Sequence, residues 1–94
     1  MSPLYKVLRI PLEKINANNY NPNKIASTEM NLLIRSITED GYTMPIVCYY
    51  LESKDQYEIV DGFHRYMAMK KSKDIYEREG GHLPIVVIDQ PNTN

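Results

Sequence analysis

Residues 59–66 have the sequence Ile59-Val60-Asp61-Gly62-Phe63-His64-Arg65-Tyr66. The alternating apolar residues at 56–60 predict a strand that ends here, and the composition from Phe63 to about Lys71 favours a helix. Gly62 permits a tight turn between the two because it has no Cβ atom. This stretch therefore predicts a sheet with a strand that leads directly into a helix.

The segments on either side predict the rest of the fold. Apolar patterns predict further strands at residues 6–10, 46–51 and 83–88. A helix with apolar residues at helical spacing is predicted to begin at a cap on Ser27 or Thr28 and to end at Gly41. Residues 52–55 form a polar hairpin turn, and the polar segment 72–82 contains a short helix at 75–79. This order predicts an α+β fold, a small mixed sheet with two or three helices.

Length and composition predict one domain. The chain has 94 residues and a net charge of −1, with 11 basic and 12 acidic side chains. We expect a single domain over residues 1–90 and a disordered tail at 91–94. Total charge gives no indication of a strongly basic nucleic-acid binder. With no apolar run of membrane length, no secretory signal and a single cysteine, we expect a cytoplasmic protein with no membrane contact. We expect Cys48 to be a buried structural thiol.

The start of the helix after Gly62 is the candidate site. A helix start carries unpaired N–H groups and partial positive charge, so it suits an anion. His64 and Arg65 lie in its first turn, and Arg supplies a planar fork that matches phosphate oxygens. A plain capped helix with solvated side chains explains the same residues equally well. The standard glycine-rich nucleotide loops are not found in the sequence.

Four stretches, in the same order along residues 10–88, resemble the sequence boxes of the ParB/sulfiredoxin superfamily, and of ParB N-terminal domains in particular. They are Ile10-Pro11-Leu12 with Tyr20-Asn21-Pro22, Leu33-Ile34-Arg35-Ser36-Ile37 through Gly41, Thr43-Met44-Pro45-Ile46-Val47, and Tyr57-Glu58-Ile59-Val60-Asp61-Gly62-Phe63-His64-Arg65-Tyr66-Met67-Ala68. The resemblance implies the ParB/sulfiredoxin-like form of the α+β fold.

The resemblance also implies a nucleotide site, because these families bind CTP in partition proteins and ATP in sulfiredoxin and related serine kinases. The phosphates would be held by the turn at Gly62–Arg65. CTP or ATP, with Mg²⁺, is the implied cofactor, and the chain itself provides no metal site. The implied nucleotide-binding and phosphate-binding residues are Ser36, Thr43, Pro45, Asp61, Gly62, Phe63, His64 and Arg65.

Departures from the family pattern at two positions limit what the resemblance implies. Phe63 stands where sulfiredoxin has its nucleophilic cysteine, so sulfinic-acid chemistry is not expected. Phe63 also replaces the glutamate of the partition-protein G-E-R-R box, which helps to build the metal–nucleotide site. Asn23 stands where the family has the arginine of its N-P-R box.

The resulting prediction is a nucleotide-binding regulatory module of a ParB-like partition or transcription-regulating system. Phosphates would neutralise His64 and Arg65 and order residues 16–23 or 72–82. DNA would be contacted through a further domain or a partner protein. The cluster Lys70, Lys71 and Lys73 fits either the negative end of a helix or a contact with the DNA backbone or a partner.

Two other functions stay open. One is an enzyme, a phosphotransferase or nuclease of the same superfamily, with Asp61 as the acid placed near a bound phosphate. The other is a protein-interacting coactivator, like the IbrB-like proteins that carry this domain. The oligomeric state, a homodimer included, is also open.

Overall fold

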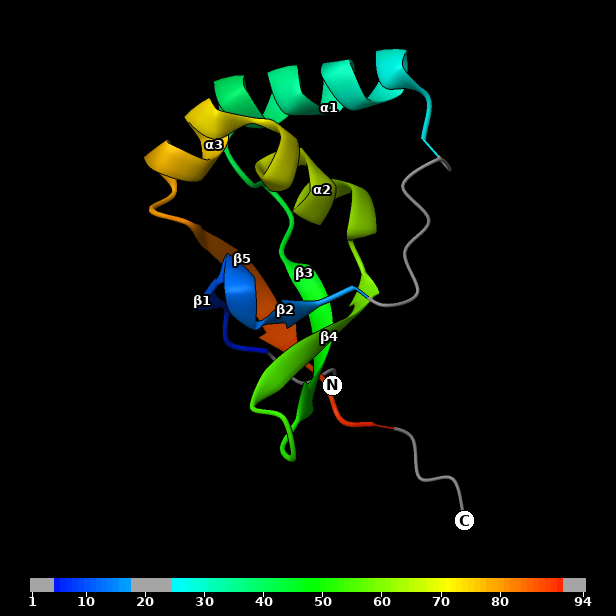
Figure 1. The fold of residues 1–94 in the computed structure, drawn as a ribbon, viewed down its shortest axis with the longest axis vertical. Helices are drawn as coiled ribbons and strands as arrows, with labels where there is room; N and C mark the ends of the chain where they lie inside the picture. The colour runs from blue at the N-terminus through cyan, green and yellow to red at the C-terminus, as the bar shows by residue number, and fades with distance from the viewer. Residues whose placement is uncertain (1–4, 18–24, 91–94) are drawn as a thin grey trace.

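The computed structural model describes residues 5–17 and 25–90 (Figure 1). Within these ranges the elements are β1 (Leu8–Pro11), the 3-10 turn η1 (Leu12–Lys14), β2 (Ile15–Asn16), α1 (Ser27–Asp40), β3 (Ile46–Leu51), β4 (Gln56–Asp61), α2 (Phe63–Lys71), α3 (Lys73–Arg78) and β5 (His82–Val87). The predicted α+β class is confirmed, with three helices and one mixed sheet. The predicted tail at 91–94 and the box at Tyr20-Asn21-Pro22 lie outside the described residues.

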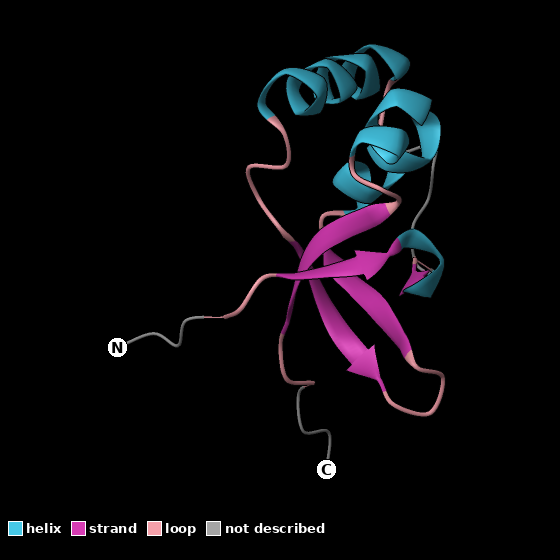
Figure 2. Cartoon of the chain, turned by 90° about the vertical axis from the view of Figure 1, so that its left-hand side faces the viewer, coloured by secondary structure: helices cyan, strands magenta, loops and turns pink. Residues whose placement is uncertain are grey.

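The sheet is mixed because it contains both antiparallel and parallel strand pairs. Its strand order is β1-β5-β3-β4-β2. β3 and β4 form the predicted antiparallel hairpin, while β5 runs parallel to β3 and antiparallel to β1. β2 adds a short parallel edge next to β4. The three helices gather at one end of the sheet, so β4 rises into α2 at the boundary between the two layers (Figures 1 and 2).

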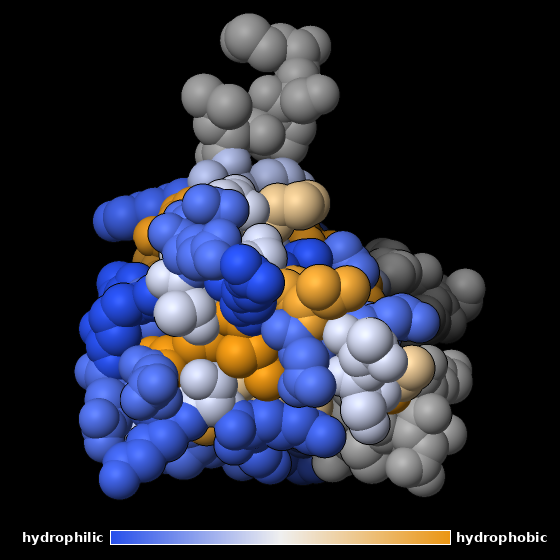
Figure 3. Space-filling model, turned by 90° about the horizontal axis from the view of Figure 1, so that it is seen from above, coloured by the Kyte–Doolittle hydropathy of each residue, from blue (hydrophilic) through white to orange (hydrophobic). Residues whose placement is uncertain are grey.

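The core lies between the helices and one face of the sheet. Alternate residues of the central strands supply one side, and the apolar stripes of the helices supply the other. Its largest fully buried side chains are Ile46, Met69, Ile75, Leu83, Ile85 and Cys48. The outer surface above the helices is mainly hydrophilic and surrounds a limited hydrophobic area (Figure 3). Among residues 5–17 and 25–90, no helix has the length and apolar character that crossing a membrane requires.

Of the two predicted ends of α1, the C-terminal one is confirmed and the N-terminal cap is wrong. Gly41 ends the helix with φ 77°, and its N–H donates to the Ile37 carbonyl at 2.8 Å. The predicted cap on Ser27 or Thr28 is wrong, because the N-cap is Ala26 and it makes no side-chain hydrogen bond. Ser27 is instead the first helical residue.

Several short elements differ from the prediction. η1 and β2 were not expected, and β1 begins at Leu8 rather than at residue 6. The short helix predicted at 75–79 is confirmed with shifted ends, because α3 runs from Lys73 to Arg78. Ser72 caps it by accepting a hydrogen bond from the Ile75 N–H at 3.2 Å. The ordering of residues 16–23 or 72–82 by a bound nucleotide stays a prediction, and residues 18–24 lie outside the described residues.

Candidate anion site at the start of α2

The turn between β4 and α2 requires glycine. Gly62 has φ 102° and ψ 23°, a left-handed conformation that residues with a Cβ atom rarely adopt. A Cβ atom there would lie 3.0 Å from Ile46 Cγ1 and 3.1 Å from Arg65 Nη2. Gly62 thus lets the start of α2 approach both β3 and the guanidinium of Arg65.

A hollow of about 180 Å³ lies at this helix start, lined by Asp61, Gly62, Phe63, His64 and Arg65. Gly62 is the N-cap of α2 and provides no side-chain cap. The first N–H groups of a helix have no partner within it, so they carry partial positive charge. The hollow therefore combines a helix start with a histidine and an arginine, which is a chemically suitable place for an anion.

Arg65 is the most constrained side chain of the hollow. Only 23% of its side chain is exposed, and its Nη2 lies 3.4 Å from the Pro45 carbonyl oxygen and 3.9 Å from Asp61 Oδ2. Its Nε atom is buried and has no hydrogen-bond partner among the described residues. A buried charged donor without a partner costs free energy, since its hydration is lost without replacement. An anion in the hollow would place a compensating negative charge beside this guanidinium.

The structure brings most of the predicted site residues together. Asp61, Gly62, Phe63, His64 and Arg65 line one hollow, and Pro45 contributes its carbonyl from the segment before β3. Thr43 and Ser36 are exposed, on the segment before β3 and on α1. Neither is among the residues that line the hollow.

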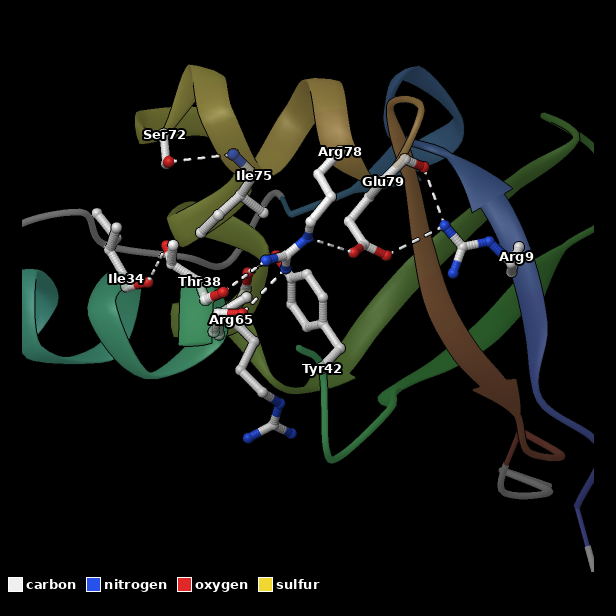
Figure 4. Close-up of polar contacts among 10 residues, drawn as sticks. Arg9, Ile34, Thr38, Tyr42, Arg65, Ser72, Ile75, Arg78 and Glu79 are labelled. Atoms are coloured by element: carbon white, nitrogen blue, oxygen red, sulfur yellow. Dashed lines mark hydrogen bonds and ion pairs between the residues drawn. The ribbon is translucent and has the colours of Figure 1, made fainter. Parts of the chain in front are cut away.

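Tyr42 is a residue of this region that the sequence did not reveal. Its hydroxyl donates to the backbone carbonyl of Arg65 at 3.0 Å (Figure 4). Burial, reinforced by the nearby Glu79 carboxylate, raises the pKa of Tyr42 well above its ordinary value, so the hydroxyl remains a donor. No sequence pattern indicates this contact, because the acceptor is a backbone atom 23 residues away.

A second unpredicted contact anchors the segment that carries Tyr42. Arg78 donates from Nη1 to the Thr38 carbonyl at 2.7 Å and from Nη2 to the Ile37 carbonyl at 2.9 Å (Figure 4). The last turn of α1 has no basic residue of its own, so Arg78 supplies the positive charge that favours a helix C-terminus. α3 therefore fixes the end of α1 just before Tyr42.

The remaining candidate groups lie apart from the hollow. Cys48 is fully buried in β3, as predicted, and burial raises the pKa of its thiol to about 12. Among residues 5–17 and 25–90, no group of three or more His, Cys, Asp or Glu side chains is placed to hold a metal ion.

Comparison of the sequence with protein families finds a match over nearly its whole length. The model of the ParB N-terminal domain matches residues 3–93. The uncharacterized protein YbdM of Escherichia coli (strain K12) is 40% identical over 87 residues, which are 93% of this chain and 41% of YbdM. A nucleoid occlusion protein of Lysinibacillus sphaericus (strain C3-41) is 39% identical over 67 residues, 70% of this chain and 22% of that protein. The chain thus spans less than half the length of these relatives.

Solved structures share the fold. The C-terminally truncated chromosome-partitioning protein ParB from Caulobacter crescentus, complexed with CTP-γ-S, matches with a TM-score of 0.69 at 24% identity, over 93% of this chain and 46% of that one. Sulfiredoxin from Arabidopsis thaliana matches with a TM-score of 0.63 at 23% identity, over 94% of this chain and 88% of that one. These matches confirm the predicted ParB/sulfiredoxin-like architecture.

Proposed function

This chain belongs to the ParB N-terminal domain family, and we propose that it is a regulatory module that binds CTP or ATP with the phosphates in the hollow at the start of α2. The observation that carries this proposal is the state of Arg65. Its guanidinium is mostly buried beside a helix start that has no side-chain cap, and it lies 3.9 Å from Asp61 Oδ2, while its Nε has no partner among the described residues. A phosphate in the hollow would place negative charge beside this guanidinium and at the positive end of the helix.

Each lining residue has a proposed role. Gly62 lets phosphate approach the backbone closely, while His64 and Arg65 supply hydrogen-bond donors, the arginine with a permanent positive charge. Asp61 is the one carboxylate among the residues that line the hollow, so it would face a Mg²⁺ ion carried by the nucleotide. Because Mg²⁺ in such sites keeps waters and phosphate oxygens as ligands, one carboxylate is a fitting contribution from the protein.

The other residues implied by the family would complete the site around the nucleoside. Pro45 already contacts Arg65, and the exposed Thr43 beside it would form a second wall. Phe63 would supply apolar contact, and Ser36 would offer a hydroxyl from α1. The solved ParB with CTP-γ-S, which has the same fold, supports a nucleotide as the ligand.

The similarity to a nucleoid occlusion protein and to a chromosome-partitioning protein supports a role in a DNA-associated system. We propose that nucleotide binding regulates a partition or transcription assembly in the cytoplasm. DNA would be reached through a further domain or a partner protein, and a homodimer is the simplest assembly. The near-neutral net charge of the chain agrees with DNA being contacted by a further domain or a partner protein instead of by this chain.

Calorimetric titration with CTP, ATP and GTP, each with and without Mg²⁺, tests the proposal. We expect CTP or ATP to bind with a Kd below 1 mM and to raise the unfolding temperature. Arg65→Ala should weaken binding by at least about 10-fold, since charged hydrogen bonds contribute roughly 1.5–3 kcal/mol. Arg35→Ala is the matched control, because Arg35 is exposed on α1 and pairs with Glu39. Failure of CTP and ATP to bind below 1 mM would refute the proposal.

A second candidate, phosphoryl transfer, is favoured by the position of Asp61. Its side chain is exposed at the edge of the hollow, where it would meet a substrate hydroxyl next to a bound phosphate. Asp61→Asn should then abolish turnover while nucleotide binding persists. Absence of turnover with a panel of small hydroxyl compounds would leave the regulatory function. For a coactivator that only binds proteins, Arg65→Ala would leave partner binding intact.

A further inference from the structure

Tyr42 connects two parts of the molecule that form the proposed site. It follows Gly41, which ends α1, and it precedes the segment Thr43–Pro45, which leads into β3. Its ring is half-buried against the core, and its hydroxyl crosses to α2, where it donates to the Arg65 carbonyl at 3.0 Å. A residue outside the hollow therefore holds the first turn of α2.

The segment that carries Tyr42 contacts Arg65 a second time. The Pro45 carbonyl accepts from Arg65 Nη2 at 3.4 Å, so the backbone and the guanidinium of Arg65 both meet the segment 42–45. Figure 4 shows the Arg65 side chain pointing away from Arg78 and Glu79, while the backbone of Arg65 faces Tyr42. These two contacts fix the relative position of α2 and the segment before β3.

Contacts from α3 fix the end of α1 that precedes Tyr42. The guanidinium of Arg78 binds the last carbonyls of α1 at Ile37 and Thr38, immediately before the turn at Gly41. Glu79 accepts from Arg78 Nε at 3.0 Å and from Arg9 Nη2 at 3.1 Å. Hydrogen bonds thus run from β1 through α3 and the end of α1 to the turn that bears Tyr42 (Figure 4).

We infer that Tyr42 is a positioning residue of the phosphate site, holding the first turn of α2 and the Arg65 guanidinium against the segment 43–45. This inference rests on the proposed function, because it concerns the same hollow. Binding sites need their contacting groups held to within about 0.5 Å, and supporting hydrogen bonds usually provide that precision. Tyr42 does so without lining the hollow itself.

The test compares Tyr42→Phe with Tyr50→Phe. Each variant loses one hydroxyl with one known acceptor, but the Tyr50 hydroxyl binds Asp55 at the remote hairpin. Calorimetry with CTP, and with ATP if CTP does not bind, should show affinity weakened about 3- to 10-fold in Tyr42→Phe, the usual worth of one hydrogen bond. Tyr50→Phe should stay within about 2-fold of the wild type. In the absence of nucleotide, the Arg65 Nε–H signal in a ¹H–¹⁵N spectrum should shift or broaden only in Tyr42→Phe.

The possible results distinguish a failure of the role of Tyr42 from a failure of the proposed nucleotide binding. If the wild type binds neither CTP nor ATP, the proposed function fails and the inference fails with it. If the wild type binds and Tyr42→Phe binds equally well, only the inference is overturned. Weaker binding with an unchanged Arg65 signal also overturns it, because Tyr42 would then act by another route. If Tyr42→Phe does not fold, Arg78→Lys replaces it. That variant keeps the charge but loses the forked contact, and it should weaken binding in the same direction.

Discussion

Asp61 and Arg65 face each other across the start of α2, with 3.9 Å between Asp61 Oδ2 and Arg65 Nη2. The carboxylate is 76% exposed, whereas the guanidinium is 23% exposed. Because the ion pair is long and its carboxylate is solvated, it stabilises the positive charge of Arg65 only weakly. The pair therefore leaves positive charge available at the hollow, and an incoming anion would compete with Asp61 for it.

Asp61→Asn should strengthen CTP binding measured in EDTA by about 2- to 5-fold, because an exposed ion pair is worth roughly 0.2–1 kcal/mol and the variant removes the competing charge. Calorimetry measures the change. Asp74→Asn, an exposed acid on α3, is the control and should leave the affinity unchanged. Weaker binding of Asp61→Asn in EDTA would contradict this account of the pair.

Gly62→Ala should lower stability more than Gly80→Ala. Both glycines have positive φ, so each substitution strains the backbone at a cost of about 1–3 kcal/mol. A Cβ atom at Gly80 would come no closer than 4.0 Å, to His82 Nδ1, whereas one at Gly62 would crowd Ile46 and Arg65. We expect Gly62→Ala to cost at least about 1 kcal/mol more, which is roughly 4–8 °C in unfolding temperature for a domain of this size. Equal unfolding temperatures of the two variants would show that Ile46 and Arg65 move aside from the added methyl group without a cost in stability.

The hairpin tip should contribute pH-dependent stability. Asp55 accepts hydrogen bonds from Lys14 at 2.7 Å and from Tyr50 at 2.8 Å, and the Lys14 contact, followed by Tyr50, lowers the pKa of Asp55 below 3.8. A lowered pKa in the folded state means that the unfolded chain binds the proton more readily. The stabilisation is therefore present above pH 3.8 and is lost as the pH falls through the folded pKa.

Thermal unfolding of the wild type and of Asp55→Asn across pH 7 to 2.5 measures this contribution. Asn tolerates the positive φ of 50° at this position, so the comparison isolates the charge. The difference in unfolding temperature between the two should be largest at neutral pH and should shrink in acid. A difference that stays constant down to pH 2.5 would mean that the Lys14 contact does not form in solution.

Cys48 should be inert in the native protein. Its thiol is fully buried, and burial raises its pKa to about 12, so almost no thiolate is present at pH 8. A thiol-reactive disulfide reagent should react only after unfolding in guanidinium chloride, which serves as the positive control. Rapid reaction without denaturant would show that β3 opens locally.

The features set by local chemistry could be predicted from the sequence. The strand, turn and helix around Gly62 follow from alternation, from a residue that tolerates positive φ and from helix-forming composition. The hairpin and the end of α1 at Gly41 follow from similar local rules. For the same reason the sequence could predict that the five consecutive residues 61–65 lie together, as they do around one hollow.

Features that depend on distant contacts could not be predicted. β2 has two residues, too few for a periodic pattern, and it exists because β4 offers a free edge. Ala26 is the N-cap of α1 although Ser27 and Thr28 are the better caps by residue type. The hydrogen bonds of Tyr42 and Arg78 end on backbone carbonyls 23 to 41 residues away, where side-chain identity leaves no signal.

The most direct test of the central claim is a ¹H–¹⁵N spectrum of the whole chain recorded during titration with Mg²⁺ and CTP, and separately with Mg²⁺ and ATP. We predict that one of the two shifts the backbone N–H signals of residues 62–66 and the Arg65 Nε–H signal more than any others. Saturation with both nucleotides without shifts at these positions would contradict the claim that the start of α2 holds phosphate.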